Sequence, residues 1–261
     1  MALKKISKKR VISEDEVTTF DFLRGYKDKD GVLHKDFDLV EITGAEEEAI
    51  SKQAIKNNGA KIIRVLLSRC ITRIGTIRQE ETKKDDWENI IKSLDVFDQD
   101  YAYLKLREIS KGKELELKHS CPQCKKELHS VIDTDEFEIE PWNGLEQIDF
   151  MLPKGIIDKD GNVHKKGVLR LPQGLDREIL TPIAQQNMGH GVTLMLTRCI
   201  QSIEGIDVVT EEMVRKLKIM DRDYLNKLLQ ENKYGMDTTV ELTCPICGYE
   251  FEGDLNTINF I

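Results

Sequence analysis

Polar and apolar residues alternate on both sides of an Asp-Gly turn near the start of the chain. The stretch FDFLRGYKDKDGVLHK at residues 20–35 holds two such runs, with Asp30 and Gly31 between them. This arrangement predicts a β-hairpin, because Asp-Gly readily adopts the backbone of a tight turn. A closely similar stretch, FMLPKGIIDKDGNVHK at residues 150–165, predicts a second hairpin.

Helical spacing replaces the alternation after the first hairpin. Thr43-Gly-Ala-Glu46 has the capping-box pattern and predicts a helix that runs to about Asn57. The next helix is predicted by apolar residues on one helical stripe. They are Ile62, Ile63, Leu66, Leu67, Cys70, Ile71 and Ile74, and in the second half Val192, Met195, Leu196, Cys199, Ile200 and Ile203. Because free cysteine behaves as a small hydrophobic residue, we expect Cys70 and Cys199 to be core thiols.

Two more helices are predicted in each half, near 84–95 and 99–111 and again near 210–219 and 222–233. Asp98 and Asp221 fit N-caps, and Gly112 and Gly235 fit helix C-termini. An alternating strand follows each glycine and runs into Cys-Pro-x-Cys. The fold class that we expect is α+β.

The same motifs occur twice, in the same order. Asp28 to Gly31 are identical to Asp158 to Gly161, and Arg69-Cys70-Ile71 is identical to the triplet at 198–200. Each copy ends in Cys-Pro-x-Cys, and the copies differ mainly by a deletion in a charged segment, which a surface loop tolerates. We infer an internal duplication of a unit made of a β-hairpin, a helical bundle and a zinc knuckle.

The duplication sets the expected domain boundaries. We expect the first repeat at residues 18–138, a linker at 139–147 and the second repeat at 148–261. Residues 1–17 stand outside the repeats and form a basic N-terminal arm.

Four cysteines form the candidate metal site. A Cys-Pro-x-Cys motif after a strand is the usual form of a zinc knuckle, and a structural zinc takes four ligands. Each repeat supplies two, so the economical prediction is one shared ion per chain, with the two knuckles joined in one zinc ribbon. Its ligands are Cys121, Cys124, Cys244 and Cys247. A closed ligand set of this kind is structural and not catalytic.

Other arrangements of the cysteines stay open. His119 and His129 flank the first knuckle and could complete a local Cys2His2 site, although the second copy has Leu242 and Glu252 there. The motifs could also be redox dithiols without a metal. That reading expects a helix after the motif, whereas the flanking residues here predict strands on both sides.

Composition limits the class of protein. The chain has 261 residues, of which 39% are hydrophobic and 33% charged, which is enough to bury a core. It has 39 Lys+Arg against 47 Asp+Glu and 6% aromatic residues, which argues against nucleic acid as a partner. No apolar run is long enough for a membrane span, so we expect no membrane partner. The N-terminus has no secretory pattern, so a reducing cytoplasm is the default compartment.

Motifs of common enzyme classes are absent. The sequence has no phosphate-binding P-loop, no dinucleotide-binding glycine pattern, no zinc-protease helix motif and no serine-hydrolase elbow. The acidic hairpin turns lack the spaced ligands and distal Glu of a calcium loop. The Asp-x-Asp-Tyr motifs at 98–101 and 221–224 are read as a cap and a packed tyrosine, and not as paired catalytic carboxylates. We expect no enzymatic activity and no small-molecule substrate.

The ordered motifs resemble one family of phage proteins. They are the Thr-Gly-Ala-Glu-Glu-Glu string, a helix with Leu-x-x-Arg-Cys-Ile, Asp-x-Asp-Tyr, and a strand that enters Cys-Pro-x-Cys. Their carriers are Gly44, Glu47, Arg69, Cys70, Asp98, Asp100 and Tyr101, with Gly174, Arg198, Cys199, Asp221, Asp223 and Tyr224 in the second half. This order is similar to that of the baseplate hub and hub-assembly proteins of T-even-like contractile-tailed phages, and of related contractile injection systems. Ala102-Tyr103 departs from the second half, which has Leu225 after its tyrosine.

The resemblance implies a non-enzymatic structural or assembly protein of a contractile tail baseplate. Its implied partners are other baseplate or hub proteins, and its implied location is the host cytoplasm during assembly or the virion tail baseplate. The alternative hypothesis is a zinc-ribbon accessory protein that binds nucleic acid through the basic arm, which contains Lys4, Lys5, Lys8, Lys9 and Arg10.

Overall fold

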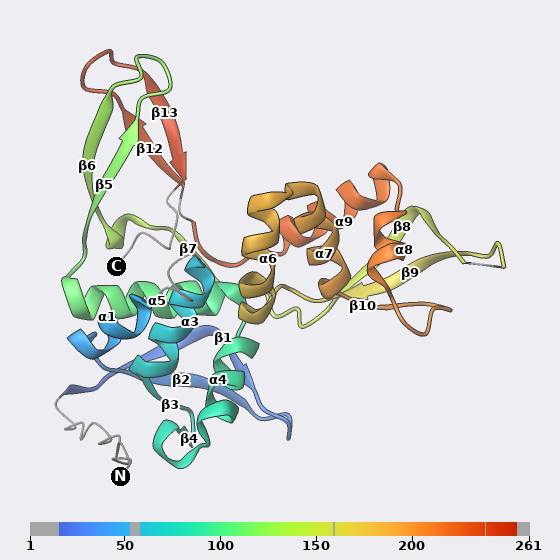
Figure 1. Ribbon diagram of the computed structural model, residues 1–261, viewed down its shortest axis with the longest axis horizontal. Helices are drawn as coiled ribbons and strands as arrows, with labels where there is room; N and C mark the ends of the chain where they lie inside the picture. The colour runs from blue at the N-terminus through green and yellow to red at the C-terminus, as the bar shows by residue number, and fades with distance from the viewer. Residues whose placement is uncertain (1–15, 53–57, 159, 238, 255–261) are drawn as a thin grey trace, which may run out of the picture.

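Two long β-hairpins open the two halves of the chain (Figure 1). The computed structural model describes residues 16–52, 58–158, 160–237 and 239–254. The predicted basic arm therefore lies outside the described residues, apart from its last two positions. In the first half, β1 (Thr18–Lys27) pairs with β2 (Leu33–Leu39). In the second, β8 (Ile148–Ile157) pairs with β9 (Val163–Leu169). Both predicted hairpins are confirmed.

Helices and short strands follow each hairpin, so the fold is α+β. The helices are α1 (Gly44–Ile50), α3 (Gly59–Cys70), α4 (Lys84–Ser93), α5 (Val96–Lys111), α6 (Gly174–Gln186), α7 (Met188–Cys199), α8 (Glu211–Arg215) and α9 (Ile219–Glu231). The remaining strands are β3 (Ile71–Ile74), β4 (Ile77–Arg78), β5 (Glu114–Ser120), β6 (Glu127–Asp133), β7 (Ile139–Glu140), β10 (Ile200–Ile203), β11 (Gly235–Met236), β12 (Thr239–Thr243) and β13 (Glu250–Asp254).

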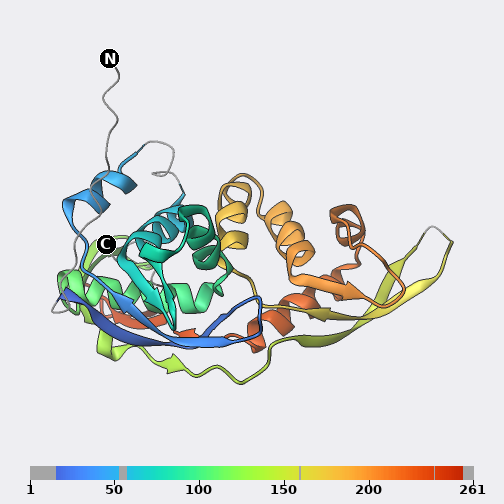
Figure 2. The same ribbon diagram turned by 90° about the horizontal axis from the view of Figure 1, so that it is seen from below.

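Each long hairpin forms one side of a separate sheet. The first has the strand order β1-β2-β3-β4 and the second the order β10-β9-β8. Every described pairing in them is antiparallel. Seen from below (Figure 2), the blue hairpin of the first half and the yellow hairpin of the second lie one after the other along one edge. The yellow hairpin reaches well beyond the helices at the far end.

The predicted apolar stripe is helical only in part. The helices end at Cys70 and Cys199, and Ile71 and Ile200 continue as strands β3 and β10. The prediction of a helix through Ile74 and Ile203 is therefore wrong. The segments ITRI and IQSI are rich in β-branched residues, which favour strands, and they pair with β2 and β9. The four isoleucines are still buried, within strands and not within a helix.

The predicted helix ends need three corrections. Asp98 and Asp221 are not N-caps, because α5 begins after Asp95 and α9 after Lys218, which places both aspartates within the first turn. Gly112 does end α5, with a φ of 86° that suits glycine. Gly235 does not end α9, which stops at Glu231 with Asn232 as its C-cap; Gly235 lies in β11. The predicted capping box, Thr43 with Glu46, is present and begins α1, which ends earlier than expected, at Ile50.

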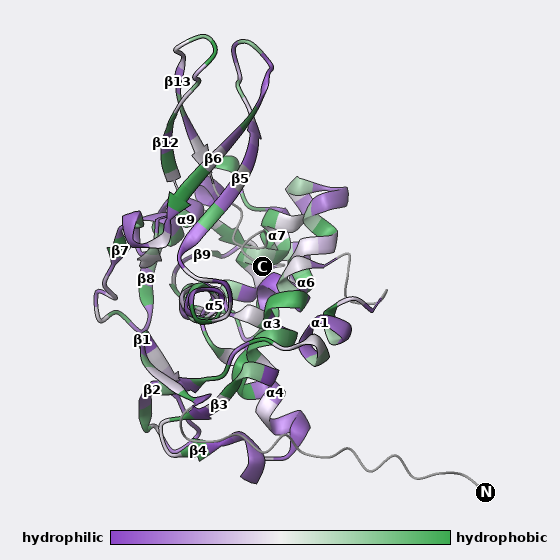
Figure 3. Cartoon of the chain, turned by 90° about the vertical axis from the view of Figure 1, so that its left-hand side faces the viewer, coloured by the Kyte–Doolittle hydropathy of each residue, from purple (hydrophilic) through white to green (hydrophobic). Residues whose placement is uncertain are grey.

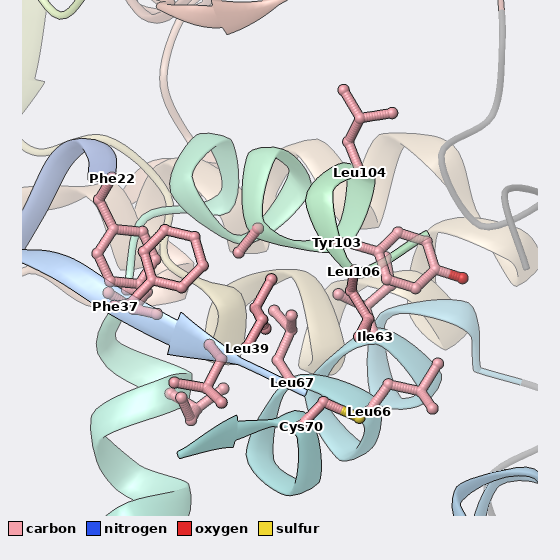
Figure 4. Close-up of a cluster of buried hydrophobic side chains, with 14 of the residues drawn as sticks. Phe22, Phe37, Leu39, Ile63, Leu66, Leu67, Cys70, Tyr103, Leu104 and Leu106 are labelled. Atoms are coloured by element: carbon pink, nitrogen blue, oxygen red, sulfur yellow. The ribbon is translucent and has the colours of Figure 1, made fainter. Parts of the chain in front are cut away.

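Each sheet and its helices enclose a hydrophobic core. In the first core (Figure 4), Phe22 and Phe37 stack with ring centroids 4.0 Å apart, and Leu67 and Cys70 of α3 lie on the same cluster. The second core contains Cys199 in the position equivalent to Cys70. Both thiols are fully buried among apolar side chains, as expected for core cysteines. Burial raises the pKa of the Cys199 thiol to about 12, which keeps it protonated and unreactive.

Helix α6 of the second half packs against α3, α4 and α5 of the first. Glu178 of α6 accepts a hydrogen bond from Arg64 Nε of α3 at 2.6 Å. The backbone N–H of Gly174 donates to the carbonyl of Leu94 at 2.9 Å. Asp95 pairs with Arg24 of its own half and also accepts a hydrogen bond from the hydroxyl of Tyr234 at 3.1 Å, which joins the two halves. These contacts fix the two halves against each other.

Two further hairpins project side by side from the body of the molecule. They are β5–β6 and β12–β13, and both Figure 1 and Figure 3 show their turns at the end farthest from α5. They join the first core through Leu115 and Ile132 at the base of β5–β6 and through Leu242 of β12. The hairpin of the second half therefore rests on the core of the first. We call these two hairpins together the arm, whereas the N-terminal residues 1–17 are always called the basic arm.

Candidate metal centre

Each Cys-Pro-x-Cys motif forms the turn at the tip of one arm hairpin. In the first turn, Cys121 N–H donates to the carbonyl of Lys126 at 3.0 Å, and Lys125 N–H donates to the carbonyl of Cys121 at 3.0 Å. The second turn repeats both bonds, from Cys244 to Tyr249 at 2.9 Å and from Gly248 to Cys244 at 2.8 Å. Lys125 and Gly248 hold the same left-handed position, with φ values of 60° and 70°. The two knuckles thus have the same backbone.

The four cysteine sulfurs converge between the two turns. Cys121 Sγ lies 3.7 Å from Cys247 Sγ, and Cys124 Sγ lies 3.7 Å from Cys244 Sγ. All four sulfurs lie within 4.8 Å of one another. Four sulfurs about 2.3 Å from a tetrahedral zinc would lie about 3.8 Å apart, so the spacing fits that ion. Both short distances join one hairpin to the other, which means that an ion here would connect the two halves of the chain.

Backbone amides around Cys121 favour its charged form. Burial by itself raises the pKa of this thiol, but the N–H groups of Cys124 and Gln123 point toward the sulfur and lower the pKa to about 7. The Cys124 N–H lies 3.5 Å from Cys121 Sγ. Amides directed at a thiolate are the usual surroundings of a zinc knuckle, because a metal ligand must be deprotonated.

The four thiols also influence one another. The N–H of Tyr249 lowers the pKa of Cys247, but desolvation and the thiols of Cys244, Cys121 and Cys124 outweigh it and raise that pKa to about 12. One thiolate in such a cluster therefore opposes the next. A divalent cation would remove this repulsion, so the donor set fits a cation better than it fits four free thiols.

The alternative arrangements find less support. Among the described residues, the group that could hold a metal contains the four cysteines and neither His119 nor His129. His129 lies beside Glu127 at the surface, and His119 contacts the ring of Phe251. Strands flank both motifs, in contrast to the helix that a thioredoxin-like dithiol would open.

The other acidic motifs have structural partners. Asp28 accepts hydrogen bonds from the N–H groups of Asp30 and Val32, both at 2.9 Å, and lies 3.0 Å from His34. Asp158 makes the equivalent contacts in the second hairpin. Asp98 faces the backbone of β1, and Asp100 forms an ion pair with Arg177 of α6. These carboxylates are engaged in turns and in packing.

A comparison with family models gives one match, which covers most of the chain. The model described as T4 bacteriophage base plate protein matches residues 40–259. The chain belongs to this base plate protein family. The searches of curated proteins and of solved structures returned no match. The match confirms the resemblance to T-even baseplate proteins, and it includes both cysteine motifs and all the helices described above.

Membership of the base plate family gives the protein a structural role in the phage tail baseplate. Within the described residues, no helix is both long enough and apolar enough to cross a membrane.

The residues that the sequence analysis did not identify are those that join the helices, strands and turns to one another. His34 is one example: its ring packs beside Gly75, where an added Cβ would lie 2.2 Å from Nδ1. His164 and Gly205 repeat the relationship, and the equal spacing of these pairs in both halves was the available signal.

Proposed function

We propose that this base plate protein is a non-enzymatic hub or hub-adjacent component of a contractile phage tail. The family match over residues 40–259 is the observation that carries the proposal. The protein acts through protein-protein contacts with other baseplate or hub proteins. The closed set of four cysteine ligands supports the absence of catalysis, because it leaves no open position on a metal for a substrate.

The four cysteines are proposed to hold one structural zinc ion per chain. Cys121 and Cys124 supply two ligands from the first repeat, and Cys244 and Cys247 supply two from the second. The bound ion supplies a cross-link between the two arm hairpins. Around it, the backbone N–H groups of the turns orient the sulfurs, and the small cluster of Cys121, Leu128 and Cys244 excludes water beneath them.

The two halves are proposed to be repeats of one unit. Three features recur at equivalent positions: the irregular register of the hairpin, the Asp-His contact in its turn, and the aspartate that faces it from α5 or α9. The knuckle turns recur as well. The proposed boundaries remain 18–138 and 148–261, with the linker at 139–147 between them.

Co-purification tests the proposed role. The protein is co-expressed with the other tail components of its phage and recovered through an affinity tag on one of them. We expect it in a complex with baseplate or hub proteins. Recovery only as a lone chain, with those components present and folded, would contradict the proposal. A complex held by protein-protein contacts should survive nuclease and high salt. In the alternative, nucleic acid bound by the basic arm holds the complex together, and the same treatment should disrupt it.

A further inference from the structure

The second half has an exposed surface that corresponds to the surface of the first half on which α6 packs. In the first half, α3, α4 and α5 together receive α6. If the halves are repeats, as proposed above, the equivalent surface of the second half is made by α7, α8 and α9. We call it the terminal face. The yellow hairpin that extends past the helices in Figure 2 lies at this same end.

Large apolar side chains are exposed at the starts of α9 and α7. Ile219 and Met220 begin α9, and their side chains are 69% and 57% exposed. Their counterparts Val96 and Phe97 are partly buried. The backbone N–H of Val96 donates to the carbonyl of Pro172, just before α6, at 3.1 Å, whereas the ring of Phe97 packs on Tyr234, which follows α9. Met188, at the start of α7, is 69% exposed. Exposed apolar residues that gather on one face indicate an interaction surface.

The element that would fit this face is present in every copy of the chain. Helix α1 is the counterpart of α6 and begins in the same way, with a capping box and a glycine. Gly174 is buried against Gln99, and an added Cβ would lie 1.7 Å from Gln99 Nε2. Gly44, its counterpart, is exposed, with nothing within 4 Å of an added Cβ. The start of α1 is therefore exposed, whereas the start of its counterpart α6 is buried against the first half.

One pair of charges on the two exposed surfaces is complementary. In the internal contact, Glu178 of α6 meets the guanidinium of Arg64 on α3. The counterpart of Glu178 is the exposed Glu48 on α1. The counterpart of Arg64 is Thr193. The guanidinium of Arg222 takes the place of the Arg64 guanidinium, since it donates to Thr193 Oγ1 at 2.9 Å. A guanidinium therefore lies where Glu48 would arrive.

We propose that the terminal face binds α1 of a second copy of this chain, head to tail. The contact repeats the one between α6 and the first half, with Glu48 beside Arg222 and Gly44 against the start of α9. Such a contact joins two different surfaces, so it continues from copy to copy and generates a ring or a filament. It depends on the proposed repeat relationship and not on the metal.

One pair in this contact is unfavourable. The counterpart of Arg177, which pairs with Asp100, is Glu47, and the counterpart of Asp100 is the exposed Asp223. Glu47 and Asp223 would lie close together with equal charge. Removal of the charge by Asp223→Asn is therefore expected to tighten the association, at least twofold in Kd.

Sedimentation velocity of the metal-loaded full chain over a concentration series tests the proposal. Wild-type protein should associate, and Met220→Asp on the terminal face and Glu48→Arg on α1 should each weaken the association at least tenfold. Both side chains are exposed, so the variants should fold. An equimolar mixture of the two variants retains one intact pair of surfaces and should form dimers that grow no further. Val131→Asp, an exposed position on the arm, is the control and should behave as wild type.

Three results would overturn the proposal. One is a wild-type protein that stays monomeric at its highest soluble concentration. The second is association that neither Met220→Asp nor Glu48→Arg reduces. The third is a mixture of these variants that stays monomeric. If the chain is monomeric alone but Met220→Asp loses a tail component in co-purification, the occupant is that component and not a second copy. The proposed baseplate role would survive each of these results, since only co-purification tests it.

Discussion

The carboxylate of Asp98 accepts a hydrogen bond from the backbone N–H of Gly25 at 2.9 Å. It also receives the N–H groups of Leu23 at 2.8 Å and Arg24 at 3.1 Å. These residues lie where the register of β1 and β2 shifts, so their N–H groups do not face a regular ladder. Asp221 does the same for Lys154 at 2.7 Å in the second hairpin. One buried aspartate in each half therefore fastens a helix to a hairpin.

Replacement of Asp98 by alanine should destabilise the fold by about 2–4 kcal/mol, because several backbone N–H groups would lose their acceptor. Asp221→Ala should cost less, since Asp221 faces Lys154 and, more distantly, Gly155. The control is Asp223→Ala at an exposed position of α9, which should change stability by less than about 0.5 kcal/mol. Urea denaturation of the three variants gives the values. Equal losses for Asp98 and Asp223 would contradict the assigned role.

The two counterpart glycines make a matched pair. Gly174→Ala would drive a Cβ into Gln99, whose side chain is buried and bonded to the carbonyl of Ile91 at 2.7 Å. We expect a loss of about 1–3 kcal/mol from this overpacking. Gly44→Ala meets no neighbour within the chain and should leave the monomer unchanged or slightly more stable, because alanine favours a helix. A similar loss in both variants, measured in dilute protein, would show that packing against Gln99 is not the cause.

Stability should also depend on pH through the second hairpin. The hydrogen bond with Asp158 raises the pKa of His164, and the same contact lowers the pKa of Asp158. A histidine with a raised pKa in the folded state stabilises the fold below its unfolded pKa of about 6.5, and this contribution is lost as the pH rises through the folded value. The contribution of Asp158 is present above its unfolded pKa of about 3.9 and is lost as the pH falls toward the folded value.

The melting temperature should therefore fall between pH 6 and pH 8, and His164→Gln should reduce that fall. His129→Gln is the control, because His129 is exposed and lies 3.8 Å from Glu127. Differential scanning calorimetry at both pH values measures the effect. An unchanged fall in His164→Gln would mean that other groups cause the pH dependence.

Removal of the proposed zinc ion should loosen the arm and leave the rest of the fold intact. The tip has its own small cluster of Cys121, Leu128 and Cys244, whereas the base of the arm belongs to the first core. Without a cross-link, residues 119–129 and 243–250 should lose protection against hydrogen exchange. The amides of α3 and α5 should keep theirs. Hydrogen exchange before and after chelation distinguishes this outcome from global unfolding, in which all of these segments would lose protection together.

Features that a short segment encodes could be predicted from the sequence. The hairpins, the capping box at Thr43 and the strand-turn-strand form of both knuckles follow from local pattern. Asp98 was misread because its position fits a cap, and only the tertiary structure brings β1 over it. Ile71 was misread because the spacing of the stripe continues past Cys70 while the backbone changes to a strand. Pairing with β2 decides that change, and it is a long-range interaction.

The candidate site was predictable for a different reason. A knuckle with two ligands is incomplete, and the second Cys-Pro-x-Cys motif supplies two more cysteines. The docking of α6 on the first half could not be predicted, because it depends on how Gly174 meets Gln99. No sequence spacing encodes that contact.

Metal content per chain, measured on protein purified without added zinc, tests the central claim most directly. Wild-type protein should contain one zinc ion per chain, and Cys121→Ser and Cys244→Ser should each lose it. Cys70→Ser is the control, because this core thiol lies outside the four-cysteine cluster and its variant should retain the ion. Two ions per chain that are lost independently, or wild-type protein without metal, would contradict one shared site that joins the two halves.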